Sequence, residues 1–220
     1  MIGFYDYTVV LTYTSVFSAV TGIALCFSGH PYWAVFCLLF CGLCDAFDGR
    51  VARAKKNRTE DEKRFGIQID SLSDLIAFGV LPACLVISIC RFAWYGALVA
   101  AFYVLAALIR LAYFNVTEEL RQQAEADAAL QSYSGLPVTS ASLIFPILTC
   151  IVIPFHDDRP LLRVISCAVM LLTGLLFVLP FKLRKPNQKE IWLLIALGAL
   201  IAVVLVLILF VNPTFIRGRR

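Results

Sequence analysis

Four aspartates lie close together in the sequence, two on each side of a basic stretch. Asp45 and Asp48 end one apolar run, and Asp70 and Asp74 begin the next. A charged side chain at mid-bilayer costs on the order of 3 kcal/mol, so carboxylates at such positions indicate a function. Clustered carboxylates also repel one another, and Mg²⁺ and Mn²⁺ are the cations that prefer oxygen ligands. We therefore predict that these four aspartates bind divalent metal.

Helical spacing brings small residues onto the faces that carry these acids. Positions three, four and seven apart share a helix face. The two faces that this rule predicts are Asp45, Asp48, Gly49 and Ala52 on one helix and Gly66, Asp70 and Asp74 on the next. A glycine beside a carboxylate lets a bulky ligand approach the helix backbone. Arg53, one turn beyond Gly49, is a cation suited to phosphate oxygens, so metal and phosphate chemistry are expected together.

The composition places this chemistry in a membrane. Of the 220 residues, 60% are hydrophobic and 15% are charged, and the mean hydropathy is +0.84. A soluble domain needs a larger charged surface than this. Apolar runs of about 18 residues or more follow one another along the chain and leave no room for a separate soluble domain. We expect one integral membrane domain over residues 1–220.

Reading about 20 apolar residues as one helix predicts an all-α bundle with seven spans. They cover residues 8–28, 32–53, 68–90, 93–116, 138–155, 160–180 and 190–212. Residues 50–64 hold seven of the 19 Lys and Arg, and residues 182–189 hold four. Positively charged loops stay on the cytoplasmic side, so the acidic cluster is predicted at the cytoplasmic face. With seven spans, the Arg-rich C-terminal tail then lies on the outer side of the membrane, which conflicts with the rule that positively charged segments stay on the cytoplasmic side.

Two interpretations other than an enzyme fit clustered intramembrane aspartates. One is an inter-helix network of ion pairs with Arg, but this explains neither the glycines nor the surplus of acids. The other is a divalent-cation transporter, for which buried aspartates are also expected. The sequence shows no inverted repeat and no second acidic site, and this favours an enzyme.

The pattern resembles the signature of the CDP-alcohol phosphotransferase family. The matching residues are Asp45, Asp48, Gly49, Ala52, Arg53, Gly66, Asp70 and Asp74. The resemblance implies a homodimer and a six-helix catalytic core, to which this chain adds one helix, the last. It implies two metal ions on the four aspartates, Asp74 as the catalytic base, and CDP-diacylglycerol bound by Gly49, Ala52, Arg53, Thr59 and Gly66. The halves are four residues further apart than usual, and we treat residues 60–63 as an insertion in a loop.

Three further blocks resemble the branch of this family that uses L-serine, the phosphatidylserine synthases. They are Asp70-Ser71-Leu72 running on to Phe78-Gly79 and Pro82, then Ile109-Arg110-Leu111 to Asn115, then Ser134-Gly135-Leu136-Pro137. The resemblance implies transfer of a phosphatidyl group from CDP-diacylglycerol to L-serine, with release of CMP. Serine contacts are assigned to Ser71, Arg110 and Asn115. The same transfer to glycerol 3-phosphate or an inositol phosphate is the alternative.

The resemblance also implies a cellular location. The chain itself departs from the family pattern in its first helix. The setting it implies is the cell membrane of a prokaryotic type of cell, with membrane lipids as partners and no nucleic acid. The first helix of many family members carries an Asn near the nucleotide. This chain has Thr12, Thr14, Ser15, Ser18 and Thr21 there. Such hydroxyls either replace the amide or bond carbonyls of their own helix, and we leave that helix out of the site.

Overall fold

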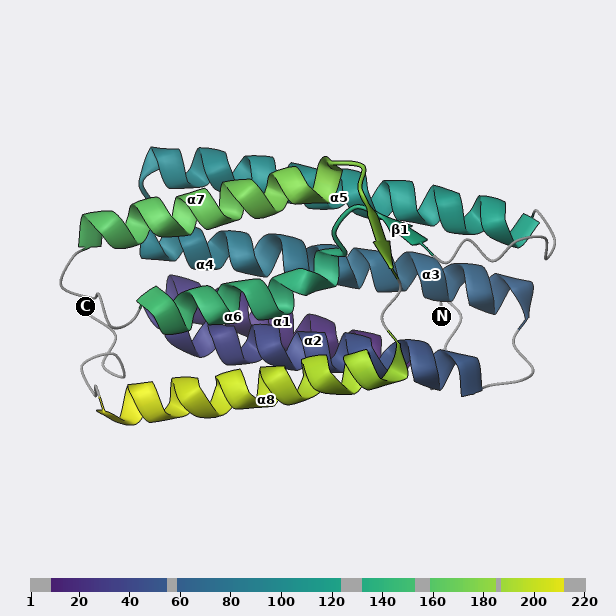
Figure 1. Ribbon diagram of the computed structural model, residues 1–220, viewed down its shortest axis with the longest axis horizontal. Helices are drawn as coiled ribbons and strands as arrows, with labels where there is room; N and C mark the ends of the chain where they lie inside the picture. Colours follow the sequence, from purple (N-terminus) through teal and green to yellow (C-terminus); the bar gives the residue numbers. More distant parts are fainter. Residues whose placement is uncertain (1–8, 55–58, 124–131, 153–158, 185–186, 212–220) are drawn as a thin grey trace.

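Long helices run side by side through the computed structural model (Figure 1). The structure describes residues 9–54, 59–123, 132–152, 159–184 and 187–211. Its helices are α1 (Val10–Phe27), α2 (Pro31–Ala54), α3 (Glu60–Asp74), α4 (Leu81–Ile89), α5 (Trp94–Gln123), α6 (Ala141–Val152), α7 (Arg159–Val178) and α8 (Gln188–Val211). A π-helical segment, η2 (Leu75–Val80), joins α3 to α4, and a 3₁₀ turn, η3 (Val138–Ser140), precedes α6. The predicted all-α membrane bundle is confirmed.

The seven predicted spans correspond to helices, but one of them is short. Counting α3, η2 and α4 as one rod over Glu60–Ile89, six described helices are long and apolar enough to cross a membrane. Helix α6 has only 12 residues, about 18 Å at 1.5 Å per residue. The span predicted over residues 138–155 is therefore described only as far as Val152. Pro137 precedes η3 there, and residues 153–158 lie outside the description.

The third rod begins earlier than predicted. The Thr59 hydroxyl accepts a hydrogen bond from the Glu62 amide at 3.2 Å, and the Glu62 carboxylate accepts one from the Thr59 amide at 2.9 Å. This reciprocal pair satisfies two amides that a helix start leaves unbonded. Glu60, Asp61 and Glu62 then occupy the first turn, where acidic groups suit the helix dipole. Residues 60–63 are thus the beginning of α3, and the expectation that they lie in a loop is wrong.

The π-helical segment follows directly after Asp74 and is supported from α5. Pro82 has no N–H to donate to the carbonyl of Phe78, four residues earlier. The hydroxyl of Tyr103, on α5, donates to that carbonyl at 2.7 Å. Both Tyr103 and Phe78 are fully buried. A widened turn of this kind is frequent beside functional sites, and here it is held by a neighbouring helix.

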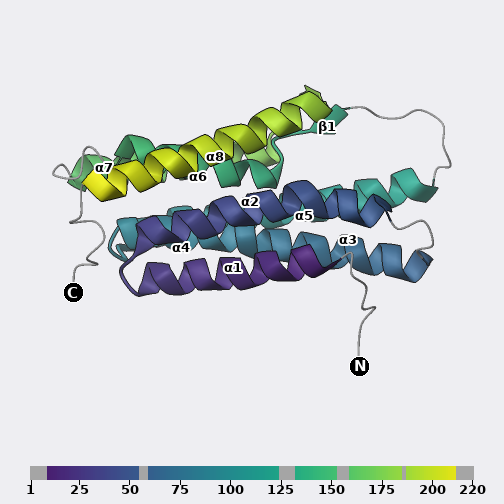
Figure 2. The same cartoon turned by 90° about the horizontal axis from the view of Figure 1, so that it is seen from below.

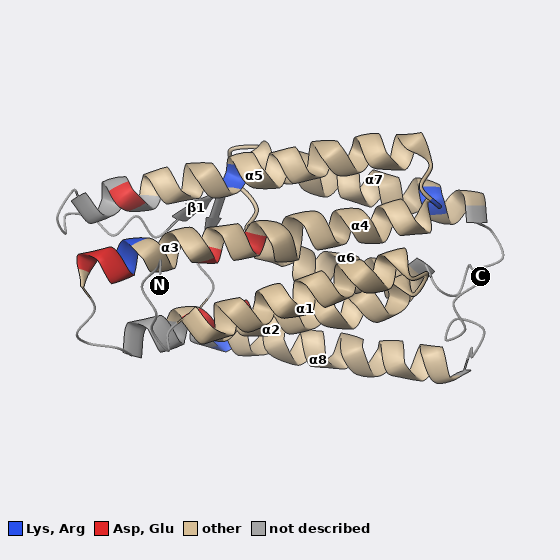
Figure 3. Ribbon diagram, turned by 180° about the vertical axis from the view of Figure 1, so that it is seen from behind, with Lys and Arg blue, Asp and Glu red and all other residues tan. Residues whose placement is uncertain are grey.

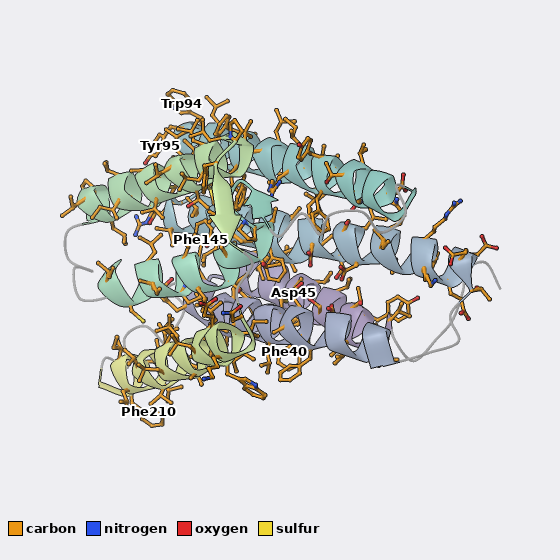
Figure 4. All side chains as sticks on the ribbon, turned by 45° about the vertical axis from the view of Figure 1, so that its right-hand side comes forward. Phe40, Asp45, Trp94, Tyr95, Phe145 and Phe210 are labelled. Carbon is orange, nitrogen blue, oxygen red and sulfur yellow. The ribbon has the colours of Figure 1, made fainter. Side chains whose placement is uncertain are left out.

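Aromatic side chains fill the interior, and others cover the outside. The Tyr103 ring lies 5.6 Å from the Phe145 ring and 5.4 Å from the Phe177 ring, which ties α5 to α6 and α7. Phe210 is 78% exposed and Trp94 is 75% exposed, and Figure 4 shows both at the periphery. Charges are sparse on the ribbons of Figure 3, where α1 is tan throughout. An apolar outer surface of this extent fits a lipid environment.

A small β pair lies next to the C-terminal end of α7. Strand β1 (Ser132–Ser134) pairs antiparallel with β2 (Lys182–Arg184). The following Gly135 has φ +82°, and its amide donates to the Phe181 carbonyl at 2.6 Å. A Cβ at this position would lie 3.0 Å from the Leu179 carbonyl oxygen. The positive φ and the close backbone contact both require glycine here.

Helix α8 lies along the edge of the bundle, next to α2 and α6 (Figure 2). It joins α2 through an edge-on contact between the Trp192 and Phe47 rings, with centroids 6.2 Å apart. Most of its large apolar side chains are exposed, among them Leu193 and Phe210. This is the helix that the sequence analysis adds to a six-helix core, and it contributes none of the predicted site residues.

Candidate functional site

Three of the four predicted aspartates converge from two helices. Carboxylate oxygens of Asp45, on α2, and of Asp70 and Asp74, on α3, all lie within 4.8 Å of one another. Asp70 and Asp74 are one helical turn apart, so both reach the same side of α3. All three side chains are partly buried. In Figure 4 the labelled Asp45 lies in the interior of the bundle.

Asp48 joins this group from the next turn of α2. It is 9% exposed, and its carboxyl group lies within hydrogen-bonding reach of that of Asp70. The structure therefore brings the four aspartates together, as the signature predicts. Four carboxyl groups at such distances cannot all be ionised without a counter-charge, because their mutual repulsion is weakly screened away from bulk water.

The donor set at this cluster suits a hard divalent cation. Carboxylate oxygens from two helices are the ligands that Mg²⁺ and Mn²⁺ take, with open positions left for substrate oxygens. The separation of at most 4.8 Å between donor oxygens is one that a single shared ion can bridge. The residues present thus fit a metal centre.

The residues assigned to CDP-diacylglycerol are spread over both sides of the α2–α3 connection. Gly49 follows Asp48 directly, and Gly66 lies one turn before Asp70; both are partly exposed. Ala52 and Arg53 belong to α2, but their side chains fall outside the described residues. Thr59 is exposed, and its hydroxyl caps α3. A nucleotide contact by Thr59 stays a prediction, and it would involve a hydroxyl that already bonds the Glu62 amide.

Arg110 on α5 is buried and directed toward the Gly135 turn. It is 7% exposed. Its Nε donates to the Leu136 carbonyl at 3.1 Å, and one Nη donates to the Gly135 carbonyl at 3.5 Å. Two of the blocks that indicate the serine branch therefore contact one another, although 25 and 26 residues separate these partners.

Ser71 and Asn115 also meet in the structure. The Ser71 hydroxyl donates to the Asn115 side-chain oxygen at 2.7 Å, which links α3 to α5. The Asn115 amide group in turn donates to the side-chain oxygen of Gln68 at 3.4 Å. Sequence reasoning missed Gln68. A signal was available, because Gln68 and Ser71 are three residues apart and so share a face of α3.

Two hydroxyls of α1 bond their own helix. Thr14 donates to the Val10 carbonyl at 2.8 Å, and Thr21 donates to the Phe17 carbonyl at 2.8 Å. Ser18 donates across to the Cys37 carbonyl of α2 at 3.1 Å. These groups serve helix packing, which agrees with leaving α1 out of the site.

The sequence profile of the family described as CDP-alcohol phosphatidyltransferase matches residues 8–216 of this chain. The chain belongs to this family. The matched range includes both helices of the aspartate cluster and extends through α8. Membership favours a transferase over the divalent-cation transporter considered from the aspartates alone.

Several relatives carry the name CDP-diacylglycerol-serine O-phosphatidyltransferase. The one from Helicobacter pylori is 28% identical over 204 residues, which cover 92% of this chain and 80% of that protein. The one from Bacillus subtilis is 28% identical over 164 residues, or 73% of this chain and 79% of that protein. The one from Saccharomyces cerevisiae is 33% identical over 152 residues. That match covers 66% of this chain and 53% of the yeast protein, so the chain spans about half of its length.

Proposed function

We propose that this chain transfers the phosphatidyl group of CDP-diacylglycerol to L-serine, giving phosphatidylserine and CMP. The observation that carries the proposal is the convergence of Asp45, Asp48, Asp70 and Asp74 from α2 and α3 inside a membrane bundle. The family supports the phosphatidyl transfer, and the names of the relatives from yeast, Helicobacter and Bacillus support serine as the acceptor. We take the matched chain as one catalytic domain.

The reaction is a displacement at phosphorus. The serine hydroxyl oxygen forms a bond to the β-phosphorus of CDP-diacylglycerol, and the bond from that phosphorus to the bridging oxygen breaks, so CMP leaves. Two divalent ions, Mg²⁺ or Mn²⁺, held by the four aspartates would neutralise the pyrophosphate oxygens and the charge that develops on CMP. Asp74 is proposed as the base that takes the serine hydroxyl proton. This role is supported by its carboxylate oxygen, which lies within 4.8 Å of those of Asp45 and Asp70.

We assign the remaining contacts separately for each of the two substrates. Gly49, Ala52, Arg53, Thr59 and Gly66 would hold CDP-diacylglycerol, with the Arg53 guanidinium on phosphate oxygens. Arg110 would pair with the serine carboxylate, supported by its burial and by its position on α5 beside the Gly135 turn. Ser71 and Asn115 are proposed to border the same site. The cytoplasmic face, the prokaryotic type of membrane and the homodimer all remain predictions.

The experiment that tests this function measures CMP release by the purified full chain in micelles containing CDP-diacylglycerol. The acceptors compared are L-serine, D-serine, glycerol 3-phosphate and an inositol phosphate, and mass spectrometry identifies the lipid formed. We expect fast release only with L-serine, and loss of that release in excess chelator with recovery on adding Mn²⁺ or Mg²⁺. Faster release with glycerol 3-phosphate would overturn serine as acceptor. Undiminished release in chelator would overturn the metal proposal.

A further inference from the structure

The orientation of α3 decides whether its two aspartates face α2. Asp70 and Asp74 must point toward Asp45 for the carboxylate cluster to form. A helix packed only by apolar contacts can rotate about its axis at small cost, because those contacts are not directional. Hydrogen bonds are directional, so those made by other faces of α3 can fix the rotation of this helix about its axis.

Two neighbouring helices supply such bonds. On one side, Ser73 donates to the Thr12 carbonyl of α1 at 3.3 Å. On another side, the amide of Asn115 on α5 contacts two residues of α3: its oxygen accepts from Ser71 at 2.7 Å and its nitrogen donates to Gln68 at 3.4 Å. With 3.6 residues per turn, the face of Gln68 and Ser71 lies about 110° around the helix from the face of Asp70 and Asp74.

We infer that Gln68 is a positioning residue for the metal centre, acting through Asn115. The Gln68 oxygen accepts from the Asn115 nitrogen, and this directs the oxygen of the same amide toward Ser71. One amide then contacts α3 at two points on successive turns, which opposes rotation of the helix. Ser71 directly follows Asp70 in the sequence, so a shift of the Ser71–Asn115 contact also shifts the Asp70 carboxylate. The inference rests on the proposed function only for the nature of the metal.

The lack of charge and the exposure of Gln68 indicate that it positions the metal ligands and does not bind the metal itself. Its side chain is exposed, and it is an uncharged amide on a different face from the aspartates. The bond to Asn115 is the longer of the two. Loss of groups that orient metal ligands usually weakens metal affinity by roughly 10- to 100-fold. Because Gln68 acts through two further side chains, we expect a smaller effect, about threefold to tenfold.

The test is binding of Mn²⁺ to the purified full chain, measured from the electron paramagnetic resonance signal of free Mn²⁺ without substrates. Gln68→Met keeps the length of the side chain and removes the acceptor, whereas Gln68→Glu keeps an acceptor. The control Thr117→Ala removes a hydroxyl of α5 that donates only to the Tyr113 and Phe114 carbonyls of its own helix. We expect Gln68→Met to raise the Mn²⁺ dissociation constant about threefold to tenfold. Gln68→Glu and Thr117→Ala should not raise it.

A second readout separates positioning from contact with serine. Gln68→Met should raise the Mn²⁺ concentration for half-maximal CMP release while leaving the Michaelis constant for serine within about twofold. An unchanged Mn²⁺ dissociation constant would overturn the inference, and so would a rise only in the Michaelis constant for serine. Combining Gln68→Met with Asn115→Asp should weaken Mn²⁺ binding by less than the sum of the two separate effects, since both substitutions break the same Asn115–Gln68 hydrogen bond. If the wild type binds Mn²⁺ but releases no CMP with serine, the proposed function fails and the inference is still judged by Mn²⁺ binding.

Discussion

The Tyr103 hydroxyl donates a 2.7 Å hydrogen bond to the Phe78 carbonyl, which Pro82 leaves without its usual helical donor. Both residues are buried, and the π-helical segment that contains Phe78 begins right after Asp74. The contact thus joins α5 to the rod that carries half of the aspartate cluster. It also explains why a Phe-Gly-x-x-Pro block can lie inside a membrane helix, where every backbone carbonyl needs a partner.

Replacing Tyr103 should reveal the cost of losing this hydrogen bond to the Phe78 carbonyl. Tyr103→Phe keeps the ring contacts with Phe145 and Phe177 but removes the only atom that bonds the Phe78 carbonyl from α5. We expect a loss of about 1–3 kcal/mol in the free energy of unfolding, measured by denaturant in detergent. Tyr95→Phe is the matched control, because Tyr95 is 37% exposed and should change stability little. Equal stability of the two variants would show that the Phe78 carbonyl finds another donor.

Two variants of the aspartate cluster should behave differently. Asp74→Asn should lower turnover by about 10²- to 10⁴-fold while CDP-diacylglycerol still binds, because loss of a base acts on the transition state. Asp45→Asn should instead weaken Mn²⁺ binding and liponucleotide binding together. The measurements are CMP release and equilibrium binding of CDP-diacylglycerol in Mn²⁺. Near-normal turnover of Asp74→Asn would assign the base to another group.

Arg110 is expected to act on serine more than on the liponucleotide. A charge-assisted contact with a carboxylate is worth about 1.5–3 kcal/mol, so Arg110→Ala should raise the Michaelis constant for serine about 10- to 100-fold. The change for CDP-diacylglycerol should be smaller. Both constants come from CMP release at varied substrate concentrations.

The control for Arg110 is Gly135→Ala, which disturbs the same turn and keeps the guanidinium. Its Cβ would meet the Leu179 carbonyl oxygen at 3.0 Å, at a φ of +82°. We expect this variant to lower stability and to alter both Michaelis constants to a similar extent. If Arg110→Ala follows the same pattern, Arg110 serves only to hold the Gly135–Leu136 turn.

A cysteine pair offers a test of the packing between α4 and α7. The sulfur atoms of Cys90 and Cys167 lie 3.5 Å apart, although the residues are 77 positions apart. Diamide, a diazene oxidant, should take one hydrogen from each thiol and join these two cysteines by a disulfide. Mass spectrometry of peptides prepared without reductant should find this link, and Cys167→Ser should abolish it. Cys84→Ser, on α4, whose last residue precedes Cys90, should leave it unchanged. Failure to form the link would contradict the arrangement of α4 and α7.

The sequence by itself determined the membrane setting, the order of helices and the pairing of the clustered aspartates on their helices. These features follow from local rules: about 20 apolar residues span a bilayer, and residues three or four apart share a helix face. Asp45 and Asp48, and Asp70 and Asp74, could therefore be paired on their helices before any fold was known. The start of α3 was missed because the charged residues 60–63 read as a polar loop, while the Thr59–Glu62 capping pair makes them the beginning of a helix.

Only the tertiary structure decided which faces of different helices meet. Hydropathy cannot orient a helix that is apolar all round, and no local rule relates Asn115 to Gln68 and Ser71, or Arg110 to the Gly135 turn, across 25 residues or more. The support of the Phe78 carbonyl by Tyr103 was likewise beyond the sequence. These contacts depend on where the chain turns back and on directional hydrogen bonds between helices, which pair residues far apart along it.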